Sequence, residues 1–111
     1  MNIHRERHGG ALLLRPEGRM DGVRSAEVER ALAEVADAGY SGIVFDMSAI
    51  GYVSSAGLRV ILMAVKQAKS KQQRILFAGP SPQVREVLEM SGFLSLLEVR
   101  DSAAAAMEEL Q

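Results

Sequence analysis

The stretch GIVFDMSAIGYVSSAGLRVILMAVKQAK, residues 42–69, contains a strand, a turn and a helix in succession. Gly42–Met47 is an apolar run with one acid near its end, which is typical of a strand buried on both faces of a parallel sheet. Residues 56–71 carry apolar side chains at helical spacing and predict a helix. Its predicted inward stripe is Leu58, Ile61, Leu62, Val65 and Ala68.

The segments on either side alternate between strands and helices. Toward the N-terminus, residues 2–7 predict an edge strand, Gly9-Gly10 a hairpin turn, and residues 11–15 a strand closed by Pro16 and Gly18. Residues 24–38 predict a helix whose buried positions are Val28, Ala31, Leu32 and Val35. Toward the C-terminus we expect a strand at 74–78, a helix capped by Ser81 and ended by Gly92, a short strand at 96–99 and a helix at 102–110.

This order predicts an α/β fold in which right-handed crossovers build a mixed, mostly parallel sheet. We expect four or five strands, with residues 43–45 in the centre, packed with about four helices. The 111 residues fit one domain over 1–111, and the 48% hydrophobic content is sufficient for a core.

Composition and charge exclude several classes of function. The net charge is −1 and no basic stripe occurs, which argues against direct binding of nucleic acid. The chain has no cysteine, and His4 and His8 have no clustered acids, so we expect no stable metal site. No run resembles a signal peptide or a membrane span, and we therefore expect a cytoplasmic protein without a membrane segment.

In open parallel sheets, binding sites gather beyond the carboxyl ends of the strands. Three segments of this chain follow predicted strands and so lie in such places: Gly18–Asp21, Asp46–Ser48 and Tyr52–Gly57. In the last segment, Ser54 and Ser55 stand where a helix needs an N-cap. One interpretation is capping alone. The other is that a serine here carries a phosphoryl group, because a helix N-terminus stabilises an anion. Gly57 would then let the backbone and a partner approach closely.

These segments resemble the signature of the STAS domain family, and most closely its bacterial anti-sigma-factor antagonists. The central likeness is Asp46-Met47-Ser48 followed by Tyr52-Val53-Ser54-Ser55-Ala56-Gly57-Leu58-Arg59-Val60. Gly18-Arg19-Met20-Asp21 and Ser91-Gly92-Phe93 are similar to two flanking elements of the family. The resemblance covers essentially the whole chain and implies a STAS fold.

The resemblance also implies a function by partner switching. The unphosphorylated protein would bind an anti-sigma factor and so free a sigma factor. That anti-sigma factor would also be a serine kinase of the histidine-kinase-like ATPase type, and a serine phosphatase would reset the switch. In the family the phosphorylated serine stands two residues before the motif glycine, which maps it onto Ser55. Many members have Asp where this chain has Ser54, so Ser54 is a second hydroxyl at the turn and the runner-up.

We expect the partner to contact this turn and the outward side of the following helix. The residues assigned to that surface are Asp21, Asp46, Ser54, Ala56, Gly57, Arg59 and Met63. Simpler interpretations remain for several of them: the two acids could cap loops, and Met63 could be a single exposed apolar side chain.

Enzymatic interpretations find little support, and we expect neither catalysis nor a cofactor. The chain lacks the G-x-S-x-G motif of serine hydrolases and the glycine-rich phosphate loop of nucleotide-hydrolysing enzymes. A receiver domain with Asp46 as its phosphorylated acid would need an early acidic pair and a late lysine, and both are missing. The alternative inside the STAS family is an unphosphorylated accessory subunit of a lipid or anion transport system.

Overall fold

The computed structural model describes all of residues 1–111, and its sheet is built around the apolar strand β3 (Gly42–Asp46). β2 (Ala11–Met20) and β5 (Arg74–Ala78) flank β3 in parallel. β1 (Asn2–His8) lies antiparallel on the outer side of β2, and the short β6 (Val99–Arg100) lies parallel to β5. The order is β1-β2-β3-β5-β6, so the expected fold class and the central position of residues 43–45 are confirmed.

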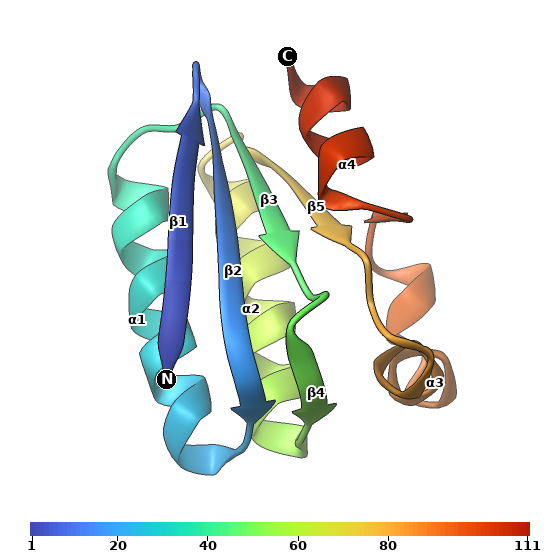
Figure 1. The fold of residues 1–111 in the computed structure, drawn as a ribbon. Helices are drawn as coiled ribbons and strands as arrows, with labels where there is room; N and C mark the ends of the chain where they lie inside the picture. The colour runs from blue at the N-terminus through green and yellow to red at the C-terminus, as the bar shows by residue number, and fades with distance from the viewer.

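β2 is longer than expected, because it does not end at Pro16 and Gly18. Its pairing with β3 stops at Leu14, and from Gly18 onward it pairs in parallel with an unexpected sixth strand, β4 (Ile50–Val53). Figure 1 shows β4 continuing the line of β3 beyond the end of that strand. Pro16 lies in the stretch of β2 that pairs with neither β3 nor β4. A residue without a backbone N–H costs least at such a position, because no hydrogen bond to those strands is lost.

The helices cover the two faces of the sheet unequally. α1 (Gly22–Asp37) and α2 (Ser55–Ser70) pack side by side behind the sheet (Figure 1), and α3 (Pro82–Met90) packs beside β4. A 3-10 turn at Phe93–Ser95 leads to β6, which replaces the strand expected at 96–99. α4 (Ala103–Leu110) lies alone on the opposite face. The core on the α1/α2 side holds 21 buried residues and that under α4 only 7, so the α4 side is partly open.

The buried side of α1 is the expected one, with Val28, Ala31, Leu32 and Val35 all buried. The buried side of α2 is rotated from the prediction. Ile61 and Ala68 are buried as expected, whereas Leu58, Leu62 and Val65 are only half-buried. Gly57, Val60 and Ala64 complete the buried set instead. The reason is that α2 packs against α1 as well as against the sheet, so its buried arc faces both neighbours.

Candidate functional site

Ser54 caps α2 and is fully engaged in hydrogen bonds. Its Oγ donates to the carbonyl oxygen of Met20 at 2.8 Å and accepts from the N–H of Gly57 at 3.2 Å. Its own N–H also donates to Met20 O, at 2.9 Å. This serine therefore ties the start of α2 to the end of β2 and satisfies one of the free N–H groups of the first helical turn.

Ser55 is the first residue of α2 and differs from Ser54 in every one of these respects. Its side chain is exposed, and its hydroxyl makes no hydrogen bond in the structure. A group attached to Ser55 Oγ would break no native interaction. It would also lie at the positive end of a 16-residue helix, which favours an anion.

Gly57 is required because a larger residue would not fit against its neighbours, and not because a partner must reach the backbone there. A Cβ at this position would lie 2.9 Å from the carbonyl oxygen of Met20 and 2.9 Å from Cγ1 of Val53. The residue is buried against β2 and β4, so it offers little surface to a partner. Its role in the motif is to let the first turn of α2 approach the sheet.

Asp21 begins α1 in the same way as Ser54 begins α2, and at the same end of the sheet. Its Oδ1 accepts from the backbone N–H of Arg24 at 3.0 Å, and its Oδ2 pairs with the guanidinium of Arg24. The hydrogen bond from the Arg24 N–H, helped by the charge of that arginine, lowers the pKa of Asp21 below its usual value. Asp21 follows Met20 directly, so its carboxylate lies beside the Ser54 turn.

Asp46 does not join this cluster, contrary to expectation. The side chain is only 5% exposed, and its Oδ1 accepts from the N–H of Ser48 at 3.0 Å. β4 separates it from Ser54, a strand of four residues that spans roughly 13 Å at about 3.3 Å per residue. The sequence pattern predicts the two together because both follow a predicted strand, and it predicts no strand between them.

Arg59 and Met63 extend the exposed side of α2 away from Ser55. The three residues are spaced four apart, so they form one stripe along the helix. Arg59 is exposed and has no ion-pair partner, and Met63 is 43% exposed. Ala56, beside this stripe, is half-buried. We call Ser55, Arg59 and Met63 the α2 stripe.

Three exposed residues next to the turn were not assigned to the partner surface by the sequence analysis. The guanidinium of Arg19 lies 4.1 Å from the ring centre of Tyr52, a cation–π contact between register partners of β2 and β4. Val23, in the first turn of α1, is 80% exposed. The pairing could have been found only by recognising β4 as a strand.

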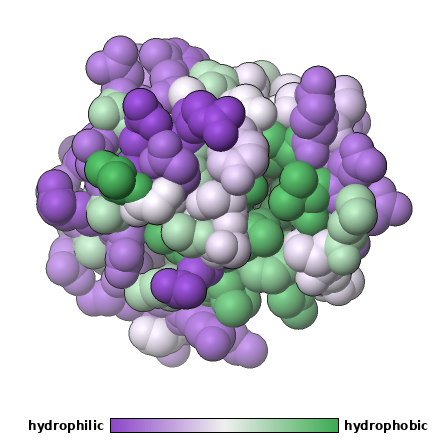
Figure 2. Space-filling view, turned by 90° about the horizontal axis from the view of Figure 1, so that it is seen from below, coloured by the Kyte–Doolittle hydropathy of each residue, from purple (hydrophilic) through white to green (hydrophobic).

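Figure 2 views the molecule from the end where β2 and β4 finish and α1 and α2 begin. Hydrophobic residues gather near the centre of this end and toward the side on which Figure 1 places α3, and hydrophilic residues surround them. No three His, Asp or Glu side chains lie close enough together to hold a metal ion. None of the helices combines the length and the apolar composition that crossing a membrane requires.

Comparison with known proteins agrees with this geometry. Residues 2–106 match the family model described as STAS domain. The chain is 36% identical to BtrV of Bordetella bronchiseptica, a candidate anti-sigma factor antagonist, over 97% of this chain and 96% of that protein. Its fold is similar to that of the anti-sigma factor antagonist SpoIIAA in the unphosphorylated form, with a TM-score of 0.82, 17% identity and coverage of 98% of this chain and 96% of that one. The phosphorylated form of SpoIIAA, from Bacillus, gives a TM-score of 0.76 at 15% identity, over 99% of this chain and 100% of that one.

Proposed function

The chain belongs to the STAS domain family, and we propose that it is an anti-sigma-factor antagonist whose affinity for its partner is set by phosphorylation of Ser55. The unphosphorylated protein binds an anti-sigma factor and thereby releases a sigma factor. The 36% identity to BtrV over nearly the whole length of both chains supports this function. The protein acts by binding, and it is the substrate of phosphoryl transfer rather than its catalyst.

The observation that carries the proposal is the contrast between the two adjacent serines. Phosphorylation of Ser54 would remove the hydroxyl hydrogen that its Oγ donates to Met20 O. The phosphoryl group would also crowd that Oγ, which accepts the hydrogen bond from the N–H of Gly57. Phosphorylation of Ser55 costs no native hydrogen bond. Ser54 therefore holds the turn in shape, and Ser55 is the hydroxyl that a kinase can reach.

The partner in this proposal is both an anti-sigma factor and a serine kinase of the histidine-kinase-like ATPase type. A serine phosphatase restores the binding form, and all three proteins meet in the cytoplasm. The surface that receives the kinase consists of the α2 stripe together with Asp21 and Ala56 beside it. Ser54 and Gly57 shape this surface from beneath, and Asp46 lies outside it.

Phosphorylation weakens binding through charge while leaving the fold intact. A phosphoserine adds about −1.5 to −2 charges at neutral pH. The N-terminus of α2 stabilises that charge by about 0.3–2 kcal/mol. Arg59, one turn along the helix and free of other ion pairs, stabilises it further. Against a partner surface the same charge must lose its water, and it lies on the side of the turn where Asp21 already adds a negative charge, so the complex loses more than the free protein gains.

Calorimetric titration of the cognate anti-sigma factor tests the proposal. Ser55→Ala should bind like the wild type, and Ser55→Glu should bind at least about tenfold more weakly, which is about 1.4 kcal/mol. Ser70→Glu is the matched control, because it adds the same charge at the exposed far end of the same helix. Equal affinity of Ser55→Glu and the wild type would contradict the proposal.

Thermal or urea denaturation of alanine variants tests the division of roles between the serines. Ser54→Ala should lose about 0.5–2 kcal/mol of stability, because the N-cap is lost. Ser55→Ala should stay within about 0.5 kcal/mol of the wild type, since its hydroxyl makes no contact. A larger loss for Ser55→Ala than for Ser54→Ala would show that the assignment is reversed.

A further inference from the structure

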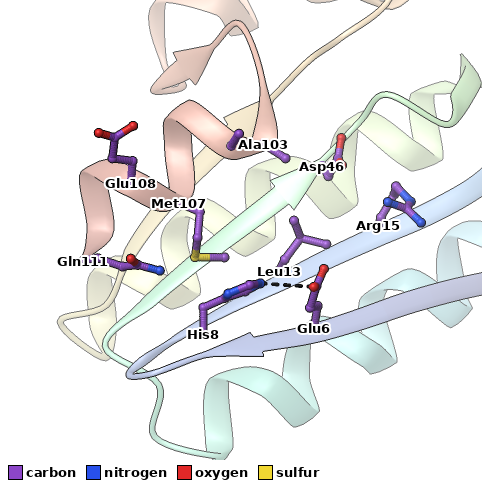
Figure 3. Close-up of a pocket in the computed structure, with 10 residues that line it drawn as sticks. Glu6, His8, Leu13, Arg15, Asp46, Ala103, Met107, Glu108 and Gln111 are labelled. Atoms are coloured by element: carbon purple, nitrogen blue, oxygen red, sulfur yellow. Dashed lines mark ion pairs between the residues drawn. The ribbon is translucent and has the colours of Figure 1, made fainter.

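A cavity of about 470 Å³ lies on the face of the sheet opposite α1 and α2. Its floor is formed by β1, β2 and the end of β3, and its wall is α4 (Figure 3). The cavity exists because α4 packs over β3 and β5 and leaves the neighbouring part of β1 and β2 uncovered. Its volume is within the range of about 300–1,000 Å³ that is usual for small-molecule sites.

Arg15 is the unusual residue of this cavity. Five arginines, at positions 15, 19, 30, 59 and 85, have no hydrogen-bond or ion-pair partner in the structure. Arg19 stacks on Tyr52, and Arg15 is the one among the five that is half-buried. Its guanidinium therefore has no anionic partner within the protein, although the residue as a whole is partly covered. Arg15 lines the cavity, so an anionic group placed there would supply that partner.

An anionic counterpart to Arg15 lines the same cavity. Asp46 is 95% buried, being 5% exposed, and only its Oδ1 is used, by Ser48 N. Leu14 and Phe45 are the last registered pair of β2 and β3, so Arg15 and Asp46 follow at neighbouring positions of the two strands. Figure 3 shows the two side chains beside each other at one end of the cavity. They nevertheless form no ion pair within 4 Å, and each keeps hydrogen-bonding capacity for a third group.

The rest of the cavity is apolar near the floor and polar at the rim. Leu13 and Met107 project into it from β2 and α4 (Figure 3). Glu6 and His8 of β1 close one side, with His8 Nε2 at 3.3 Å from Glu6 Oε1. A guanidinium, a buried carboxylate and an apolar surface are thus arranged around one space.

We propose that this cavity binds a small zwitterion with an apolar side chain, which is the chemistry of an apolar α-amino acid. The carboxylate of the ligand pairs with Arg15, its ammonium group with Asp46, and its side chain packs against Leu13 and Met107. This site goes beyond the proposed antagonist function and does not depend on it, because none of its residues belongs to the α2 stripe.

Titration of the full-length protein with L-phenylalanine, followed by ¹⁵N–¹H NMR, tests the site. Saturable shifts should concentrate on the amides of Leu13, Arg15, Asp46 and Met107. L-Phenylalaninamide, which lacks the carboxylate, and N-acetyl-L-phenylalanine, which lacks the ammonium group, should each bind at least about tenfold more weakly. The proposal is overturned if L-phenylalanine, L-leucine and L-methionine all fail to saturate by about 10 mM, or if either derivative binds as well as its parent.

Two substitutions locate the binding. Arg15→Gln should weaken the affinity at least about tenfold, whereas Arg85→Gln, at an exposed and unpaired arginine of α3, should leave it unchanged. Ala104→Glu, at an exposed residue of α4 that lines the cavity, places a negative charge beside the ligand and should also weaken binding at least about tenfold; it provides a second variant should Arg15→Gln prove unstable. Unchanged affinity in folded Arg15→Gln, or shifts confined to another face, would refute the site whatever the outcome for Ser55.

Discussion

Gly57→Ala places a methyl group where the structure has no room for one. The new Cβ would lie 2.9 Å from Met20 O, 2.9 Å from Val53 Cγ1 and 3.0 Å from Met20 Cβ. Two of the three neighbours belong to Met20, one of them a backbone oxygen of β2, and that strand is held by β1 and β4. Relief therefore requires the first turn of α2 to move outward, away from the hydrogen bonds that Ser54 makes.

The size of the effect follows from two opposing terms. Overpacking of a buried site costs about 1–3 kcal/mol. Alanine is favoured over glycine by up to about 1 kcal/mol inside a helix, and by less in the first turn. We expect a net loss of about 1–2 kcal/mol, which lowers the midpoint of urea unfolding by about 0.5–1 M for a domain of this size.

Gly22→Ala is the matched control, because Gly22 also lies in the first turn of a helix and a Cβ there meets nothing within 4 Å. This variant should be as stable as the wild type or more stable by up to about 1 kcal/mol. If Gly57→Ala unfolds at the wild-type midpoint, or if both variants lose the same stability, the close approach of α2 to Met20 is not what requires the glycine.

Three further perturbations test the core, the surface and the acid response. Ile61→Ala, at a fully buried position, should cost about 2–5 kcal/mol in urea unfolding, and a loss below about 1 kcal/mol would contradict its place in the core. Met63→Glu should weaken binding of the anti-sigma factor without changing stability, whereas Met90→Glu, at an 81% exposed residue of α3, should not; equal affinities would remove Met63 from the interface. Hydrogen bonds from Arg100 hold the pKa of Glu109 at about 2, below its ordinary 4.5. The stability that this ion pair contributes is present above the unfolded-state pKa and is lost as the pH falls toward 2. The difference in urea midpoint between the wild type and Glu109→Gln should therefore disappear between about pH 5 and pH 2. A difference that does not depend on pH would refute this role.

The sequence determined the order of the main elements because their signals are strong and local. The apolar run of β3 and the Ser81–Pro82 start of α3 depend on neighbouring residues alone, and both lie where they were predicted. Gly18 is different. Its φ of +111° accompanies a register shift in the pairing of β2 with β4, between Gly18 and Arg19, whereas the sequence pattern predicted the end of a strand there.

The site was predicted in part, for a related physical reason. The turn at Ser54–Gly57 was located correctly, since hydroxyls before an apolar helix are a local capping signal. The distribution of roles around it depends on tertiary pairing, which no local pattern reveals. The pairing of β4 with β2 brings Tyr52 to Arg19 and carries the turn away from Asp46. The same pairing of β2 with β4 brings Met20 and Val53 against Gly57 and buries it.

Site-resolved mass spectrometry after incubation with the cognate anti-sigma kinase and ATP tests the central claim most directly. We expect one phosphoryl group per chain, on Ser55. The group should persist in Ser54→Ala and be absent in Ser55→Ala. A phosphoryl group on Ser54 in the wild-type protein, or one that survives in Ser55→Ala and disappears in Ser54→Ala, would contradict the account.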